Sequence, residues 1–198
     1  KSTDGGNNWT NVLATFNNGT QNIFKLAMHP TNPNILFCAS TNGLYRTNDG
    51  GTNWNLITPT GLNSNDVDCY DLEFKPNDPL VVYLVSQWDD ISQDRTKIWK
   101  STDTGLSFTL NYTFPQNVKN CLIEVSPANP NIIYSLTSDR SSNGLYGIYK
   151  TTDNGTTWNL LATTPNMLGT QGWYNMAIAV SPLDANRVFV GGIWPHMS

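Results

Sequence analysis

An eight-residue pattern occurs four times in the 198 residues of this chain, with Ser or Thr at the first place, Asp at the third, Gly at the fifth and an aromatic residue at the eighth. The copies span residues 2–9, 47–54, 101–108 and 151–158. Successive copies therefore begin 45, 54 and 50 residues apart. A period of this size, with one turn signature in each period, is typical of a stack of small antiparallel sheets.

Each copy has the chemistry of a tight turn between two strands. The Asp carboxylate accepts hydrogen bonds from backbone N–H groups a few residues further on and closes the turn. Glycine supplies positions where φ can be positive, and the aromatic residue opens the next strand and covers the turn. The glycines with this role are Gly5, Gly50, Gly105 and Gly155. We assign structural roles to the following residues: Asp4, Gly6, Trp9, Asp49, Gly51, Trp54, Asp103, Gly105, Phe108, Asp153, Gly155 and Trp158.

The composition favours strands and excludes two classes of partner. Charged residues make up only 13% of the chain, and Asn and Thr are abundant while Ala is scarce, which disfavours helices. A net charge of −4 provides no basic face for nucleic acid. No stretch reaches the ~20 apolar residues of a membrane-spanning helix. We therefore expect no nucleic-acid partner and no membrane span.

The chain offers few metal ligands. It has two histidines, His29 and His196, and its three cysteines stand at no metal-ligand spacing, so we expect no zinc site and assign no cofactor. We interpret Cys38, Cys69 and Cys121 as small buried hydrophobic residues, with one disulfide as the alternative.

A second repeat surrounds four prolines. The residues six, four and two places before each proline are apolar, and this strict alternation is typical of a strand with one packed face. These residues are Phe24, Leu26 and Met28 before Pro30; Tyr70, Leu72 and Phe74 before Pro76; Cys121, Ile123 and Val125 before Pro127; and Met176, Ile178 and Val180 before Pro182. A second apolar run follows each proline, with an aromatic residue seven places beyond it: Phe37, Tyr83, Tyr134 and Phe189.

Each period thus holds four short antiparallel strands, which is one blade of a β-propeller. We expect blade A over residues 23–58, blade B over 70–113 and blade C over 121–162, with the eight-residue turns joining the third and fourth strands. Residues 1–14 supply the last strand of a preceding blade, and residues 175–194 begin a following one. The predicted fold class is all-β, and two arrangements stay open. The chain is a segment of a larger propeller, or its N-terminal strand completes the C-terminal blade to give four.

The eight-residue turns resemble the Asp-box, or BNR, repeat of sialidases, sortilin-type sorting receptors and xyloglucanase-type glycosidases. The copies at Asp4, Asp49 and Asp153 match in every key place, whereas the third has Phe108 where the family usually has Trp. This departure implies a less tightly covered turn. The resemblance covers essentially the whole chain and implies a propeller. Because the repeat occurs in enzymes and in binding proteins alike, it does not choose between them.

A second resemblance concerns location. Residues 171–175, together with residues 190–192, resemble large secreted proteins of Bacteroidetes that carry sortilin-like propellers, many of them exported by the type IX secretion system. The resemblance implies a secreted or cell-surface protein. It also implies the secretion machinery as a partner, which would bind the chain as its cargo.

We expect function on the loops opposite the repeated turns. Antiparallel order places the proline turns and the Asp-boxes on one face, so the loops that differ between copies lie on the other face. The candidate ligand-binding residues there are Trp88, Asp89, Asp90, Arg95, Asp139, Arg140, Trp173 and Tyr174. An aromatic ring can stack on a sugar, and carboxylates or Arg can bind its hydroxyls. The same residues also fit solvated loops or packing between blades, and both interpretations stay open.

Acidic residues form two further candidates. Glu73 and Glu124 occupy equivalent places on the innermost strands of blades B and C, where they could line a central channel or pair with neighbouring Lys or Arg. Asp66, Asp68 and Asp71 have the side chains of a calcium site but lack the ligand density of a known calcium loop. We therefore expect no metal, with a calcium site at these three residues as the alternative.

Three function hypotheses follow. The first is a secreted or cell-surface propeller that binds a protein or a glycan, because the structural repeat is complete while no catalytic constellation is recognisable. The second is part of a glycoside hydrolase with a xyloglucanase-like cleft, which requires two carboxylates ~5–9 Å apart. The third is a cargo protein of a bacterial secretion system. A sialidase is not expected, because the arginines are scattered along the chain and the Phe/Tyr-Arg-Ile-Pro motif is absent.

Overall fold

The computed structural model describes residues 1–12, 22–57, 67–88 and 95–193. In these residues the chain is all-β, as predicted, with four antiparallel sheets and no helix. No helix of the described part could therefore cross a membrane.

Three of the sheets have four strands each, paired in chain order. Blade A consists of β1 (Ile23–Met28), β2 (Leu36–Ser40), β3 (Gly43–Thr47) and β4 (Asn55–Ile57). Blade B consists of β5 (Val67–Phe74), β6 (Val82–Trp88), β7 (Lys97–Ser101) and β8 (Thr109–Thr113). Blade C consists of β9 (Val118–Val125), β10 (Ile133–Asp139), β11 (Leu145–Thr151) and β12 (Asn159–Ala162). The fourth sheet pairs β13 (Ala177–Val180) with β14 (Val188–Gly191).

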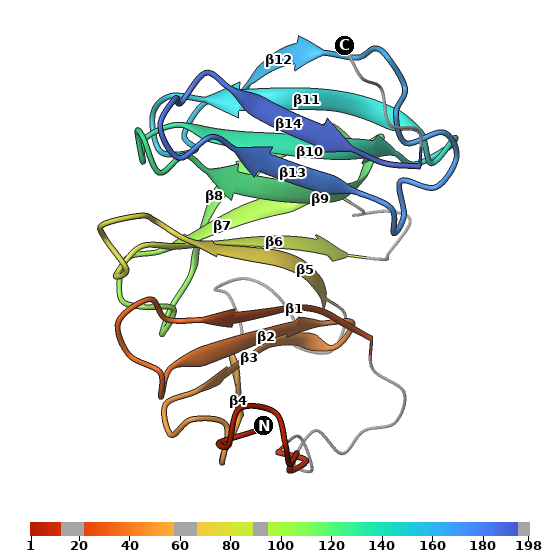
Figure 1. The fold of residues 1–198 in the computed structure, drawn as a ribbon. Coiled ribbons are helices and arrows are strands. Elements are labelled where there is room, and N and C mark those ends of the chain that lie inside the picture. The colour runs from red at the N-terminus through yellow and green to blue at the C-terminus, as the bar shows by residue number, and fades with distance from the viewer. Residues whose placement is uncertain (13–21, 58–66, 89–94, 194–198) are drawn as a thin grey trace.

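The sheets stack face to face, as Figure 1 shows. The first strands of successive sheets contact one another: β1 contacts β5, β5 contacts β9 and β9 contacts β13. This stacking of antiparallel four-stranded sheets around their first strands confirms the predicted propeller architecture.

The hydrophobic core lies between the blades. Phe37 and Leu44 of blade A pack with Leu72 and Trp99 of blade B, and a second cluster joins blade B to blade C. The second strands of blades B and C have a neighbouring sheet on both faces, and the burial of β10 is nearly complete along its length. Each blade is therefore stabilised mainly by the blades beside it.

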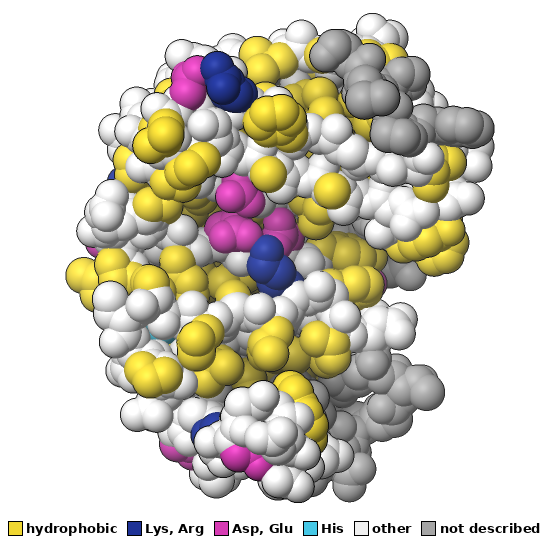
Figure 2. Space-filling view, viewed as in Figure 1, with side chains coloured by type: hydrophobic (Ala, Val, Ile, Leu, Met, Phe, Trp, Pro, Cys, Tyr) yellow, Lys and Arg dark blue, Asp and Glu magenta, His cyan; other side chains and the backbone are white. Residues whose placement is uncertain are grey.

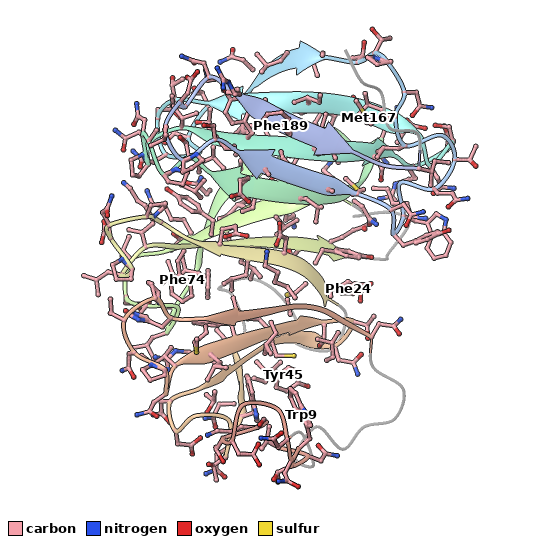
Figure 3. The ribbon with its side chains drawn as sticks, in the orientation of Figure 1. Trp9, Phe24, Tyr45, Phe74, Met167 and Phe189 are labelled. Carbon is pink, nitrogen blue, oxygen red and sulfur yellow. The ribbon has the colours of Figure 1, made fainter. Side chains whose placement is uncertain are left out.

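The same repeat position is buried or exposed according to whether a neighbouring blade covers it. Leu72 and Ile123 are each 1% exposed, whereas Leu26, at the equivalent position of β1, is 61% exposed. On the opposite side of the stack, Tyr83 is fully buried, whereas Phe189 in β14 (Figure 3) is 64% exposed. Burial of these side chains thus depends on stacking.

A shared set of hydrogen bonds holds each Asp-box. In blade A, Thr47 Oγ1 donates to Asp49 Oδ1 at 2.7 Å and accepts from the Gly51 N–H at 3.1 Å. Asp49 Oδ1 also accepts from the Asn53 N–H at 2.9 Å, and Trp54 Nε1 donates to the Gly51 carbonyl at 3.2 Å. The boxes at Asp4, Asp103 and Asp153 repeat the hydroxyl and carboxylate bonds.

Two consecutive residues have positive φ in every Asp-box, where the sequence indicated one glycine. Gly50 and Gly51 have φ of 69° and 90°. In blade B the fourth place is Thr104, with φ of 59°, and in blade C it is Asn154, with φ of 61°. The conformation is therefore imposed by the turn and not by the presence of glycine.

The Asp-box and the proline turn of each blade lie on the same face, as predicted from antiparallel order. The N–H of the fourth Asp-box residue donates to a carbonyl of the proline turn at 3.0, 2.9 and 3.1 Å: Gly50 to Asn34, Thr104 to Leu80 and Asn154 to Asn131.

The structure differs from the expectation at Phe108. Phe108 is fully buried with Phe37 in the core between blades A and B, whereas Trp54 and Trp158 are only partly buried. Phe lacks the indole N–H that Trp54 and Trp158 donate to the backbone, but its smaller ring enters the core. The turn around Phe108 is therefore well covered.

The N-terminal segment is not a regular strand in its described part. Thr10 exchanges two backbone hydrogen bonds with Lys1, at 2.7 and 2.8 Å, as Asn55 pairs with Arg46 in blade A. The remaining described residues up to 12 form no strand ladder. Residues 13 and 14 of the predicted strand lie outside the described residues.

The three cysteines are free and buried. Burial raises the pKa of each thiol, which keeps it protonated and unreactive. The interpretation as small buried hydrophobic residues is confirmed, and the disulfide alternative is wrong.

Candidate functional site

A pocket of about 350 Å³ lies on the inner strands of the propeller. Residues of β1, β5, β9 and β13, and the segment just before β13, line it: Phe24, Lys25, Tyr70, Asp71, Glu73, Asn120, Cys121, Leu122, Ile123, Glu124, Trp173, Tyr174, Met176, Ala177 and Ile178. Figure 2 shows acidic side chains and a basic one gathered in the middle of this face, with hydrophobic side chains around them. Figure 3 places Phe24 at the end of β1 away from Phe74 and the proline turns.

Lys25 is the basic group of the pocket and bridges two carboxylates of the next blade. Its Nζ lies 3.1 Å from Asp71 Oδ1 and 2.6 Å from Glu73 Oε1. Burial opposes the charge of Lys25, but the charges of Asp71 and Glu73 more than offset this and raise its pKa. Lys25 is therefore a fixed cation at the junction of β1 and β5.

Asp71 is held by the backbone as well as by Lys25. Its Oδ1 accepts from the Leu72 N–H at 2.9 Å and its Oδ2 accepts from the Ile123 N–H of blade C at 2.9 Å. The Asp71 side chain is almost completely buried. Because both oxygens are occupied, Asp71 joins three blades and has little capacity left for a ligand.

Glu73 and Glu124 remain available to the pocket. Burial and the neighbouring Asp71 charge raise the pKa of Glu73 to about 7, although Lys25 partly opposes this. Burial also raises the pKa of Glu124, with Lys25 opposing and Asp71 adding to the shift. The two glutamates were predicted either to line a channel or to pair with a cation. Glu73 does both, and Glu124 lines the pocket without a salt bridge in the described residues.

An aromatic pair, Trp173 and Tyr174, also lines the pocket. The rings of Trp173 and Tyr174 have centroids 3.9 Å apart, and about half of each side chain is exposed. Asn120 Nδ2 donates to the Trp173 carbonyl at 2.7 Å and ties this segment to β9. Tyr174 Oη donates to Gln171 Oε1. Hydrogen bonds thus hold the segment that carries the two rings, while both side chains keep exposed surface.

The other sequence-predicted site residues lie elsewhere. Asp139 Oδ1 accepts from the Ser141 and Ser142 N–H groups at 3.0 and 2.8 Å, and these partners lower its pKa. Arg140 donates to backbone carbonyls of residues 116 and 118. Neither lines the pocket, and both hold the loop after β10.

The predicted site around β6 and β7 is only partly described. Arg95 is exposed and does not line the pocket. Trp88 ends β6, and its side chain lies outside the described structure. Asp89 and Asp90 also lie outside the described residues.

Sequence reasoning missed Lys25 and Asn120 and assigned Asp71 only to a calcium alternative. Lys25 and Asp71 stand five places before Pro30 and Pro76, so they share a repeat position two places before that of Glu73 and Glu124. Comparison of this position across the repeats could have found the Lys25–Asp71 pair. The described residues contain no group of His, Cys, Asp and Glu arranged to hold a metal ion.

The Sortilin-Vps10 family model, described as "Sortilin, neurotensin receptor 3", matches residues 1–147. No curated protein matches the chain. Among solved structures, an ancestral GH74 enzyme is similar at 21% identity and a TM-score of 0.63, over 81% of this chain and 21% of that one. The GH74 xyloglucanase from Xanthomonas campestris is similar at 17% identity and a TM-score of 0.61, over 86% of this chain and 27% of that one.

A protein of unknown function from Dyadobacter fermentans is similar at 15% identity and a TM-score of 0.57, over 83% of this chain and 54% of that one. At these identities the similarity shows a shared fold. The chain spans about a fifth to a quarter of the length of the two GH74 enzymes.

Proposed function

This chain belongs to the Sortilin-Vps10 family, and on that premise we propose that it is a ligand-binding propeller whose inner pocket takes a carbohydrate. The observation that carries the proposal is a pocket of about 350 Å³ lined both by the exposed Trp173–Tyr174 pair and by Glu73 and Glu124. Concave sites of this size with apolar walls and a few polar groups are typical of small-ligand binding.

The chemistry of the pocket suits a sugar. An aromatic face gives apolar area to the C–H face of a sugar ring, and a carboxylate accepts hydrogen bonds from its hydroxyls. The GH74 xyloglucanase with a similar fold has a carbohydrate substrate according to its name, which supports the same ligand class for this chain.

Asp71 does not serve as a catalytic carboxylate. A glycosidase needs one carboxylic acid and one free carboxylate on either side of the scissile bond. Asp71 shares the partner Lys25 with Glu73, yet backbone donors and Lys25 occupy both its oxygens. Asp71 therefore acts as a positioning residue.

A glycan array tests the proposal. The full chain is applied to printed xyloglucan, arabinan, chitin and chitosan oligosaccharides, and the affinity for any glycan bound is measured by calorimetry. Trp173→Ala is expected to weaken binding at least tenfold, about 1.4 kcal/mol. Trp9→Ala is the matched control, because Trp9 is an exposed Trp outside the pocket. Absence of binding to every glycan, or equal loss in both variants, contradicts the proposal.

Glycoside hydrolysis is the second candidate, and the raised pKa of Glu73 favours it. A carboxyl group with a pKa of about 7 is partly protonated near neutral pH and can act as a general acid. Hydrolysis of xyloglucan by the full chain, measured as released reducing ends, would have to fall as pH rises above about 7 and be lost in Glu73→Gln.

We also propose that the chain works outside the cell, either as a surface protein or as the cargo of a bacterial export system. The support is the resemblance of residues 171–175 and 190–192 to exported proteins and the proposed glycan ligand. Fractionation of the source cells tests this, with detection of the chain in the cytoplasm alone as the contradicting result.

A further inference from the structure

The inner pocket holds more negative charge than its one cation balances. Asp71, Glu73 and Glu124 share Lys25 as the only lysine or arginine that lines the pocket. All lysines and arginines of the chain lie in the described residues, so Lys25 is compared with every basic side chain that could neutralise the pocket. With all carboxyls ionised, the pocket carries an excess of two negative charges.

This excess of negative charge contributes to the raised pKa of Glu73. The charged groups that face it are Lys25 from β1, Asp71 from its own strand and Glu124 from β9. The neighbouring β13 contributes only apolar residues to the pocket wall, such as Ala177 and Ile178. Burial and repulsion by the other carboxylates raise the pKa of Glu73 to about 7 despite the salt bridge to Lys25. A second cation in the pocket would relieve this repulsion.

An unsatisfied acceptor lies in the same wall. Asn120 is 6% exposed and lines the pocket. Its Nδ2 donates to the Trp173 carbonyl, but its Oδ1 has no hydrogen-bond partner among the described residues. A buried amide oxygen without a donor is costly, but this oxygen has almost no exposed surface, so Asn120 contributes to the pocket mainly by holding the Trp173 segment.

The aromatic pair also suits a cation. The face of a Trp ring attracts an ammonium group held within about 6 Å of its centroid. Trp173 and Tyr174 are exposed on the wall that adjoins Asn120. The pocket therefore combines a flat apolar surface for a sugar ring with carboxylates and ring faces for a cation.

We infer that the ligand of this pocket is an amino sugar with a free, protonated amine, bound between the Trp173–Tyr174 pair and the Glu73 and Glu124 carboxylates. The inference rests on the proposed carbohydrate-binding function and names the class of sugar. A divalent cation is not the occupant argued for, because Lys25 already holds the centre of the carboxylate group and no metal-binding group is present in the described residues.

Two trimers that differ only in charge test the inference. The β-1,4-linked trimer of glucosamine carries free amines, and the trimer of N-acetylglucosamine has the same ring skeleton without charge. Calorimetric titration of the full chain at about pH 6, where an aliphatic amine is protonated, is expected to show at least tenfold tighter binding of the glucosamine trimer. This comparison uses the unaltered chain and does not depend on the folding of a variant.

Two conservative variants locate the recognition. Glu73→Gln and Glu124→Gln are each expected to weaken binding of the glucosamine trimer severalfold more than they weaken binding of the acetylated trimer, because the charge is removed while an amide oxygen can still accept hydrogen bonds from hydroxyls. Asp184→Asn is the matched control, because Asp184 is an exposed acid in the turn between β13 and β14. A further readout is proton release, because the bound cation favours ionised Glu73. Titrations in buffers of different ionisation enthalpy should show this release in the wild type and its loss in Glu73→Gln.

The outcomes separate the inference from the proposed function. Equal affinity for the two trimers, or binding of only neutral glycans on the array, overturns the amino-sugar inference and leaves carbohydrate binding standing. Absence of binding to every glycan overturns both. Binding of trilysine as tight as that of the glucosamine trimer also overturns the inference, because the pocket would then recognise an amine without a sugar ring.

Discussion

Asp71 shows at the level of one side chain how the pocket depends on three blades. It lies on β5, pairs with Lys25 of β1 and accepts the Ile123 N–H of β9. A polar group buried in this way must be satisfied by partners from neighbouring strands. Glu73, two residues further along β5, is less constrained, and burial and the neighbouring Asp71 charge raise its pKa to about 7.

The stability of the protein should decrease as pH rises from about 4.5 to about 7 through the contribution of Glu73. The raised pKa of Glu73 means that the folded protein holds this proton more tightly than the unfolded chain does. The stabilisation is present below the unfolded value near 4.5 and is lost as pH passes about 7. Urea denaturation at several pH values is expected to show a flatter profile for Glu73→Gln, and an unchanged slope in that variant contradicts the prediction.

Thr104 is a residue whose replacement should stabilise the protein. A β-branched residue at a φ of 59° is strained, and its side chain makes no hydrogen bond in the described structure. Thr104→Gly is expected to raise the free energy of unfolding by about 0.5–1 kcal/mol, after the greater entropy of the unfolded glycine variant is subtracted. Chemical denaturation measures the change.

Gly50→Thr is the reciprocal control, because Gly50 holds the equivalent place with a φ of 69°. It should lower stability by a similar or larger amount. If neither variant changes the unfolding free energy, the fourth place of the Asp-box is not strained.

At the level of elements, the strands and turns could be predicted from the sequence because their determinants are local. Alternation before each proline and the Ser/Thr-x-Asp-x-Gly pattern lie within a few residues, and the hydrogen bonds that close each box lie within the box. The pocket could be predicted only in part. Trp173, Tyr174, Glu73 and Glu124 were candidates, but their assembly depends on how separate blades stack.

The β-bulges are a second reason why the site was not fully predicted. The pairing of β5 with β6 shifts register between Cys69 and Asp71, and the pairing of β1 with β2 shifts between Ile23 and Lys25. A bulge re-aims the side chains that follow it. Both bulges therefore adjoin the residues of the Lys25–Asp71 pair, and simple alternation does not reveal them.

The Asp-boxes should make the protein sensitive to acid. Hydrogen bonds from neighbouring backbone and side-chain groups lower the pKa of Asp4, Asp49 and Asp153 to about 2, and Asp103 reaches a similar value although slight burial opposes it. Because these values are depressed in the folded state, their stabilisation is present above about 4 and is lost as pH falls toward about 2. Thermal unfolding across this range is expected to show a shallower loss in Asp49→Asn/Asp153→Asn. An identical acid profile in this variant would show that the boxes do not govern acid stability.

At the level of the whole molecule, stability resides in the joints between blades. Leu72 and Leu26 hold the same repeat position, but only Leu72 has a preceding blade of the described structure against it. The two residues therefore form a matched pair that separates stacking from the intrinsic properties of a first strand.

Leu72→Ala should lower the free energy of unfolding by about 2–5 kcal/mol, because it removes a fully buried side chain from the joint between blades A and B. Leu26→Ala should change it by no more than about 0.5 kcal/mol, because Leu26 is largely exposed. Urea denaturation of both variants measures the difference, and similar losses would contradict a core that lies between blades.

The most direct test of a carbohydrate-binding inner pocket is an NMR titration of the full, isotope-labelled chain with the β-1,4-linked glucosamine trimer. The chemical shifts of backbone amides in β1, β5 and β9, and in residues 173–178, are expected to change in proportion to the ligand bound. The chemical shifts of amides in the Asp-boxes are expected to stay unchanged. Shifts confined to residues 139–144 and Arg95, or no shifts at all, would contradict the assignment of this pocket as the binding site.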